Sequence, residues 1–364
     1  MAQPGTLLTP LSATALVWSP DCLLHDPGAE IWIGVRTPGT ELAARATTIR
    51  AAVLTAGAPL VTASGHDDTV LEQVHDRALL DHLRDVYGQW ERAGYPVVPG
   101  QDRVVPYVFP TPGLLAGLPL RSPTAVHARA GRFCYDTMTL VGPGTWPAAR
   151  AAVDAALSAV DEVAAGRHRL AYALCRPPGH HAGRDSFGGS CYLNNAAVAA
   201  QGLRAAGHDR VAVVDLDAHH GNGTQALFYD RAEVFYGSVH VDPGAGWFPH
   251  YVGFAEESGT GEGTGANRNE PLAPGTGDAG WLEAVGRIAA SVSAHGASAV
   301  VVSLGVDAAL EDPESPLRVS RDGFHAAGAT LAELGLPVVA VQEGGYHLPT
   351  LGGLVVATLT GLAG

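Results

Sequence analysis

Two aspartates and a histidine are spaced as ligands for one metal ion. Asp217 and His219 lie two positions apart, directly after the apolar run 211–215, and Asp307 follows a second apolar run at 299–304. Side chains at positions i and i+2 of an extended chain point to the same side, so these two groups can bind one ion. Three protein ligands plus a water are typical of catalytic zinc, which lowers the pKa of that water towards about 7. The sequence therefore predicts one zinc ion per chain, bound by Asp217, His219 and Asp307.

A site with two metal ions, as in ureohydrolases of the arginase type, is the main alternative. Such sites resemble D-x-H-x-D together with a second D-x-D. The fourth position after Asp217 is Gly221, and the second position before Asp307 is Gly305. Because both additional carboxylates are missing, the sequence favours a single metal ion.

Two adjacent histidines, His180 and His181, end the motif RPPGHH. Imidazole is the side chain best suited to proton transfer near neutral pH, although two neighbouring histidines can also be a chance surface pair. Asp215 could orient one ring and Asn222 the other. A charged partner raises the pKa of an imidazole more than an amide does. We therefore expect a protonated His180 beside Asp215 and a neutral His181 beside Asn222.

A tyrosine in the motif EGGYH completes the set of candidate catalytic groups. The two glycines before Tyr346 permit backbone turns that are closed to other residues. A phenol at this position could donate a hydrogen bond to an oxyanion beside the metal. A packing role near a turn is the alternative for Tyr346 taken alone.

The elements that must position these groups are predicted from short apolar runs. Nearly continuous apolar segments are typical of strands buried on both faces of a parallel sheet. The runs are AYALC (171–175), VAVVD (211–215), EVFYGSV (233–239), AVVVSL (299–304) and PVVAVQ (337–342), and helical patterns lie at 193–206, 280–295 and 321–335. This alternation indicates an α/β fold. Each run is followed at once by candidate site residues, His240 included, and ligands bind beyond the carboxyl ends of such strands.

Composition narrows the possible partners. The formal charge of −14 argues against a nucleic-acid partner and is compatible with a cationic substrate. All 22 basic residues are arginine, which excludes catalysis through a lysine Schiff base or a P-loop lysine. No apolar run approaches the length of a membrane span, and Met1–Pro10 lacks the pattern of a signal peptide. We expect a cytoplasmic enzyme with four reduced cysteines.

A segment rich in proline and glycine interrupts the regular pattern at about 95–130. A long irregular insertion in a compact domain is usually functional or part of an interface. Both sides of the insertion fit one fold, so we expect a single domain over residues 1–364.

The motifs RPPGHHAGRDSFGG, CYLNNAAVAA, VDLDAHHGNGTQ, SLGVDA and EGGY resemble the zinc-dependent histone deacetylase superfamily. Within it, the chain is most similar to bacterial acetylpolyamine amidohydrolases, from about Leu24 to the C-terminus. The resemblance implies one domain of the arginase/deacetylase type, with a central parallel sheet of about eight strands flanked by helices.

The resemblance also implies roles for individual residues. Asp217, His219 and Asp307 would bind zinc, His181 would be the main general base and acid, and His180 its electrostatic partner. Tyr346 would polarise the acetyl carbonyl. A structural potassium ion would involve Asp215, Asp217, His219 and Ser238. The insertion at 95–130 would make a homodimer contact and narrow the mouth of the active site.

Two departures from the family pattern concern the substrate. Where the polyamine enzymes place an acid for the distal ammonium, the segment PTAVHARAG offers His127. Where the tunnel normally has an aromatic residue, this chain has Ser190. The candidate substrate-binding residues are Gly189, Ser190, Phe248, His127 and Glu343.

The leading hypothesis is an enzyme that deacetylates a small acetylated amine, such as a polyamine. A protein lysine deacetylase is the second hypothesis. A folded protein substrate needs a wide entrance to the active site, and an insertion that narrows this entrance argues against it. A non-catalytic binding module with the same fold is the third, and such proteins should have lost a ligand or the tyrosine. This chain retains Asp217, His219, Asp307 and Tyr346.

Overall fold

A sheet of eight strands forms the centre of the protein, which a computed structural model describes over residues 10–97 and 100–364. The strand order is β4-β1-β5-β10-β9-β6-β7-β8, and every neighbouring pair in this sheet is parallel. The predicted α/β fold with a parallel sheet of about eight strands is therefore confirmed. The prediction that Met1–Pro10 is not a signal peptide falls mostly on residues 1–9, which lie outside the described residues.

The strands of the central sheet are short. They are β1 (Thr14–Trp18), β4 (Leu60–Thr62), β5 (Leu170–Ala173), β6 (Val211–Asp215), β7 (Val234–Val241), β8 (Asn267–Leu272), β9 (Ala299–Leu304) and β10 (Val338–Gln342). Strands β5, β6, β7, β9 and β10 are buried at every position, as strands covered on both faces must be. A separate antiparallel hairpin joins β2 (Glu30–Trp32) and β3 (Val35–Thr37).

The described part of the chain contains eleven α-helices. They are α1 (Ala43–Thr55), α2 (Leu71–Val74), α3 (Arg77–Arg92), α4 (Pro112–Leu115), α5 (Val126–Phe133), α6 (Thr145–Ala164), α7 (Asn195–Ala205), α8 (Asn222–Phe228), α9 (Asp278–His295), α10 (Arg321–Ala332) and α11 (Leu348–Ala363). Four 3-10 turns lie at Pro20–Leu24, Tyr95–Val97, Pro243–Ala245 and Gly261–Gly263.

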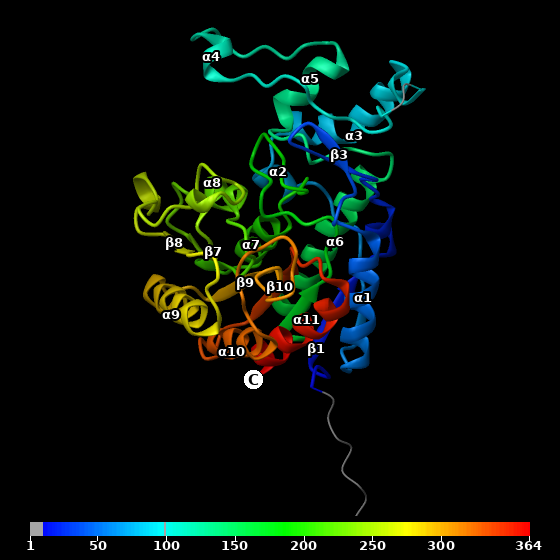
Figure 1. Ribbon diagram of the computed structural model, residues 1–364. Coiled ribbons are helices and arrows are strands. Elements are labelled where there is room, and N and C mark those ends of the chain that lie inside the picture. The colour runs from blue at the N-terminus through cyan, green and yellow to red at the C-terminus, as the bar shows by residue number, and fades with distance from the viewer. Residues whose placement is uncertain (1–9, 98–99) are drawn as a thin grey trace, which may run out of the picture.

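Two groups of helices cover the sheet (Figure 1). Helices α6 and α7 pack against each other. Helix α6 contacts β1, β5 and β10, and α7 contacts β10, β9 and β6. Helices α9, α10, α11 and α1 pack against one another in that order. The long α6 is rich in alanine, which has the best helix propensity and permits close approach to the sheet. Helix α7 begins where the Asn194 side chain accepts a hydrogen bond from the Ala197 N–H at 2.9 Å, two residues later than the predicted start.

The insertion at 95–130 forms an arm that projects from the body of the molecule, with α4 near its tip and α5 at its base (Figure 1). Helix α5 packs against α3. Several apolar side chains of the arm remain in contact with solvent: Tyr107 is 71% exposed, Leu114 63% and Leu118 71%. The arm therefore has apolar surface that the described residues leave exposed.

One wrong strand boundary bears on the candidate site. Strand β7 runs on to Val241, so His240 lies inside the strand and not after it. Its ring is buried, with Nδ1 2.8 Å from Ser238 Oγ and Nε2 2.8 Å from the Gly253 carbonyl oxygen. His240 is thus not one of the groups that face the candidate site from the end of a strand.

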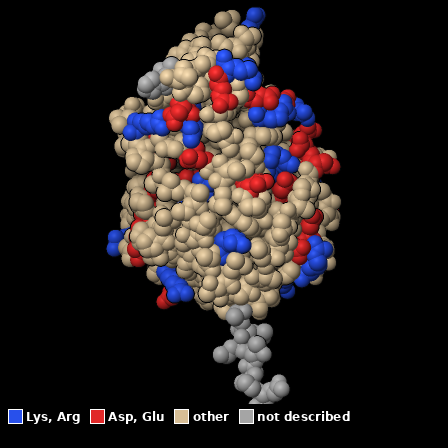
Figure 2. All heavy atoms as spheres, turned by 90° about the vertical axis from the view of Figure 1, so that its right-hand side faces the viewer, with Lys and Arg blue, Asp and Glu red and all other residues tan. Residues whose placement is uncertain are grey.

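Charged side chains of both signs are interspersed on the face shown in Figure 2. Ion pairs of this kind include Arg77–Glu72, Arg103–Asp26 and Arg150–Asp154. Among the described helices, none is long and apolar enough to cross a membrane.

Candidate active site

Asp217, His219 and Asp307 converge beyond the carboxyl ends of two neighbouring strands. Asp217 and His219 lie in the loop after β6, and Asp307 lies in the loop after β9, which pairs with β6. His219 Nδ1 lies 3.1 Å from Asp307 Oδ2 and 3.4 Å from Asp217 Oδ1. One potential ligand atom from each residue falls within 4.8 Å of the other two. The structure therefore brings together the three residues that the sequence singled out.

The surroundings of these carboxylates fit a divalent cation. Both are buried, and burial raises the pKa of Asp307, as does the neighbouring negative charge of Asp217. Backbone amides hold their remaining oxygens, with Gly344 N–H donating to Asp217 Oδ2 at 2.7 Å and Ala218 N–H donating to Asp307 Oδ1 at 2.7 Å. Two carboxylates and one imidazole nitrogen form a donor set that suits zinc.

Glycine at two nearby positions limits the site to these ligands. A Cβ atom on Gly305 would overlap the Asp217 carboxylate, and one on Gly221 would overlap Asp215. The positions that carry extra aspartates in two-metal sites are therefore packed against the existing carboxylates. This geometry supports the reading of a single ion.

The two histidines of the loop after β5 have different partners. His180 Nδ1 lies 3.0 Å from Asp215 Oδ2, and His181 Nδ1 lies 2.7 Å from Asn222 Oδ1, so both predicted pairings are confirmed. Burial disfavours the charged form of His180, but Asp215 and Asp217 outweigh this effect and raise its pKa to about 10. Burial and the charges of His180 and His219 lower the pKa of His181 well below its usual value. The two environments therefore favour the protonated form of His180 and the neutral form of His181.

Two tyrosines that the sequence did not single out hold this pair. The Tyr236 hydroxyl donates to Asp215 Oδ2 at 3.0 Å, and the Tyr135 hydroxyl donates to the His181 carbonyl oxygen at 2.9 Å. Tyr236 lies on β7, where it pairs with Val213 of β6, two residues from Asp215. Because Tyr236 lies within the apolar run 233–239, its sequence context indicates a core residue and not a site residue.

Tyr346 lies on the loop after β10, and two charged residues fix that loop. The Tyr346 N–H donates to Asp312 Oδ2 at 2.7 Å. The Arg45 guanidinium donates to the Glu343 and Gly345 carbonyl oxygens, each at 2.6 Å, and lies 4.6 Å from the centroid of the Tyr346 ring. A Cβ atom on Gly344 would overlap both Asp307 and Asp217, so only glycine allows this loop to lie against the metal ligands.

Arg45 belongs to a buried ionic network that the sequence analysis missed. Glu41 lies between Arg45 Nη1 at 2.9 Å and Arg176 Nε at 2.8 Å, and all three side chains are nearly inaccessible to solvent. Arg176 opens the motif RPPGHH, so the network connects helix α1 to the histidine loop and to the tyrosine loop. The spacing of Glu41 and Arg45, four residues apart around the start of α1, was the only sequence pattern that could have indicated this ion pair.

A cavity of about 680 Å³ opens onto these groups. Its walls include His181, His219 and Tyr346, together with Gly189, Ser190 and Phe248. Three of the five predicted substrate-binding residues therefore face the same space as the catalytic candidates. The Gly189 N–H donates to Asp136 Oδ2 at 2.6 Å, which fixes the backbone of this wall.

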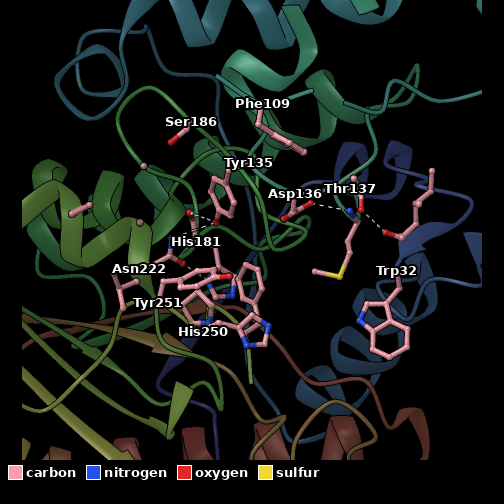
Figure 3. A pocket seen from close by; sticks show the side chains of 18 of the residues that line it. Trp32, Phe109, Tyr135, Asp136, Thr137, His181, Ser186, Asn222, His250 and Tyr251 are labelled. Carbon is pink, nitrogen blue, oxygen red and sulfur yellow. Dashed lines mark hydrogen bonds between the residues drawn. The ribbon is translucent and has the colours of Figure 1, made fainter. Parts of the chain in front are cut away.

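Figure 3 shows a second chamber, of about 580 Å³. Its lining shares His181, Phe248 and Trp32 with the first cavity. Phe109 of the insertion lies above it, and Trp32 of the β2–β3 hairpin lies on the side away from Asn222. The hairpin and the insertion thus both contribute aromatic walls near the catalytic groups.

Two predicted substrate contacts need correction. Glu343 is fully buried, and its Oε2 accepts hydrogen bonds from the Gly179 N–H at 2.7 Å and the His180 N–H at 3.2 Å. It therefore supports the histidine loop from behind and does not line the cavity. His127 Nδ1 lies 2.5 Å from the Tyr95 hydroxyl at the base of the arm, and His127 lines neither chamber of this chain.

The residues predicted for a potassium ion are also neighbours. Ser238 of β7 is the register partner of Asp215 of β6, and both are completely buried. Asp217 and His219 follow directly in the next loop.

A parallel α/β sheet that carries this candidate metal-ligand triad, an oriented histidine pair and a tyrosine on one edge defines an amide hydrolase of the deacetylase class. The chain belongs to the histone deacetylase family, because the model of the histone deacetylase domain matches residues 40–362. The family identified from the motifs is thereby confirmed.

Two bacterial relatives match over nearly their full length. The chain is 41% identical over 351 residues to the acetylpolyamine amidohydrolase of Mycoplana ramosa, covering 96% of this chain and 99% of that protein. It is 40% identical over 332 residues to the acetylpolyamine amidohydrolase of Burkholderia pseudomallei, covering 91% and 94%.

Solved structures of the family have the same fold. A crystal structure of acetylpolyamine aminohydrolase from Burkholderia pseudomallei superposes with a TM-score of 0.87 at 38% identity, covering 96% of this chain and 98% of that one. The HDA15 HD domain superposes with a TM-score of 0.77 at 28% identity, covering 97% and 90%.

Proposed function

We propose that this protein deacetylates a small N-acetylated amine of the acetylpolyamine type. The observation that carries the proposal is the cavity lined by His181, His219 and Tyr346, with the carboxylates of Asp217 and Asp307 directly beside His219. Relatives about 40% identical over nearly the whole chain act, by their names, on acetylpolyamines.

The residues of the chain divide the work of hydrolysis. Neutral His181, oriented by Asn222, takes a proton from the attacking water and later gives one to the leaving amine. The imidazolium of His180 stabilises the negative charge that develops beside it, and the Tyr346 hydroxyl donates a hydrogen bond to the amide oxygen as that oxygen becomes an oxyanion. One zinc ion on Asp217, His219 and Asp307 would activate water and polarise the carbonyl.

Two further features belong to the same proposal. A potassium ion beside Asp215, Asp217, His219 and Ser238 would balance the buried negative charge of this region. The exposed apolar side chains of the arm at 95–130 support a homodimer contact, since apolar patches of this kind commonly mark interfaces.

A panel of substrates tests the proposed function. The zinc-loaded protein is assayed with acetylputrescine, acetylcadaverine, acetylspermidine, an acetyl-lysine peptide and an acetylated amino sugar. We expect at least one acetylated amine to exceed the peptide in kcat/KM by about tenfold, which corresponds to about 1.4 kcal/mol of discrimination. A higher kcat/KM for the peptide would support a protein lysine deacetylase, and no turnover of any substrate would support a binding module.

Replacing Tyr346 by Phe should reduce kcat by about 100- to 1000-fold, because the loss of one oxyanion donor has that effect. The metal content and the affinity for a hydroxamate should stay unchanged, since the ligands of the ion are intact. Tyr87→Phe on helix α3, which lies outside the cavity lining, is the matched control and should keep the full rate. A Tyr346→Phe variant within about threefold of the wild-type rate would exclude this role.

A further inference from the structure

A tight turn over residues 188–191 forms one wall of the catalytic cavity. The Cys191 N–H donates to the Gly188 carbonyl oxygen at 3.0 Å, and the two central residues, Gly189 and Ser190, have φ angles of 58° and 60°. Positive φ at both central positions is typical of a type I′ turn. Both central residues line the cavity.

Only one residue of this turn can present a side chain to the cavity. A Cβ atom on Gly188 would overlap the Tyr135 ring, and a Cβ atom on Gly189 would overlap the His181 ring. The side chain of Cys191 is fully buried and does not line the cavity. The chemistry of this wall is therefore decided at Ser190.

The backbone of Ser190 has a conformation that favours glycine. A side chain at positive φ is sterically unfavourable, and residues that nevertheless occupy this region cluster at functional sites. Two hydrogen bonds fix the turn: the Ser190 N–H donates to Thr139 Oγ1 at 2.9 Å, and the Gly189 N–H donates to Asp136 Oδ2 at 2.6 Å. Serine stands here although glycine would fit the backbone better, which indicates a role for the hydroxyl group.

That hydroxyl group has no partner within residues 10–97 and 100–364. The one hydrogen bond that Ser190 makes there is donated by its backbone N–H, and the residue is half-buried. A serine hydroxyl can donate one hydrogen bond and accept others. Ser190 Oγ is therefore available to a ligand in the cavity.

The position of Ser190 defines which part of a ligand it can reach. The turn touches the His181 ring at Gly189, and consecutive Cα atoms lie about 3.8 Å apart. An acetamide held between His181 and Tyr346 would thus have the first carbons of its amine chain beside Ser190. A polar group on one of these carbons would meet the free hydroxyl.

We propose that the Ser190 hydroxyl binds a hydroxyl group of the substrate, carried on the second carbon from the acetylated nitrogen. The inference rests on the proposed function and makes it more specific: the substrate class is N-acetylated amino alcohols, hydroxylated diamines included. A neutral hydroxyl group suits this wall better than a carboxylate, because Glu30 and Glu314 line the same cavity and like charges repel.

Three matched substrates test this recognition. They are acetylputrescine and its derivatives with a hydroxyl or a methyl group on the second carbon from the acetylated nitrogen, each derivative supplied as separate enantiomers. The hydroxyl and methyl groups are similar in size, so their comparison isolates the hydrogen bond. We measure kcat/KM for the zinc-loaded wild type, Ser190→Ala and Ser190→Gly. Ser293→Ala, at an exposed position of α9, is the matched control.

We expect the wild type to prefer one enantiomer of the hydroxyl compound over the methyl compound by about fivefold, the effect of one neutral hydrogen bond. Ser190→Ala and Ser190→Gly should lose this preference, and Ser293→Ala should keep it. Ser190→Gly also removes the unfavourable φ, so a loss in that variant cannot come from a strained turn. Turnover of acetylputrescine by each variant shows that it is folded and holds its metal.

The contrary results are distinct. If the wild type hydrolyses none of the three compounds, the proposed function fails and this inference falls with it. If acetylputrescine is hydrolysed but neither enantiomer of the hydroxyl compound is preferred over the methyl compound, the inference is wrong and the function stands. A preference that persists in either Ser190 variant would assign the recognition to another residue and would also overturn the inference, whatever the loss of overall rate.

Discussion

Replacing Asp217 or Asp307 by Ala is expected to abolish both metal binding and turnover. Each residue supplies a carboxylate to a three-residue set whose ligand atoms lie within 4.8 Å of one another, and the described chain offers no further acid at Gly221 or Gly305 to replace it. A bound metal contributes several kcal/mol to such reactions, so kcat should fall by at least about 1000-fold. Elemental analysis should show zinc falling from about one ion per chain to none.

These substitutions also remove the hydrogen bonds that the Gly344 and Ala218 N–H groups donate to the two carboxylates. A second experiment must therefore distinguish the loss of the metal ion from damage to the protein structure. Dialysis of the wild type against a chelator removes the metal without changing any residue, and added zinc should restore activity. Asp209→Ala, an exposed aspartate just before β6, is the matched control and should retain zinc and rate. Full turnover by the metal-free wild type would rule out a metal-dependent reaction.

The sheet could be predicted because its strands are buried on both faces. The apolar runs at 211–215 and 299–304 coincide with β6 and β9, and the other runs differ from the observed strands by one or two residues at their ends. Before residue 170 the strands were not predicted, although β1 (TALVW) is buried at every position. Strand β4 and the β2–β3 hairpin are short and partly exposed, so their sequences lack the continuous apolar pattern.

The site could be predicted where its residues follow directly after a strand. The carboxyl ends of parallel strands meet at one edge of the sheet, which is why the pairings His180–Asp215 and His181–Asn222 could be inferred. Sequence proximity could not show which side of a loop faces the cavity, and Glu343 was misassigned for this reason. Its carboxylate points back to the Gly179 and His180 amides.

Residues that act across long sequence separations escaped prediction. Arg45 reaches the Glu343 carbonyl oxygen from helix α1, nearly 300 positions away, and Asp312 holds the Tyr346 amide from the loop after β9. No local sequence pattern predicts such contacts, because each depends on how elements far apart in the sequence pack together.

Replacing His181 by Ala should damage catalysis more than replacing His180 by Ala. A group that transfers protons in the transition state contributes about 100- to 10,000-fold to the rate, and only the neutral ring of His181 can accept a proton at pH 7. His180 is already protonated beside Asp215, so its loss removes a stabilising charge but not the base. We therefore expect a loss of about 1000-fold or more for His181→Ala and a clearly smaller loss for His180→Ala.

The partners of the two rings provide the decisive comparison. Asn222→Asp would place a carboxylate 2.7 Å from His181 Nδ1, and a charged partner would raise the pKa of that ring. The neutral base would then be present only at higher pH, so the acid limb of the pH–rate profile should move upward. Asp215→Asn should instead lower the pKa of His180 and weaken its stabilising charge. Because that charge lowers the pKa of His181, the acid limb should also move upward, but less than in Asn222→Asp. If Asp215→Asn shifts the acid limb and Asn222→Asp does not, His180 is the base and the two roles must be exchanged.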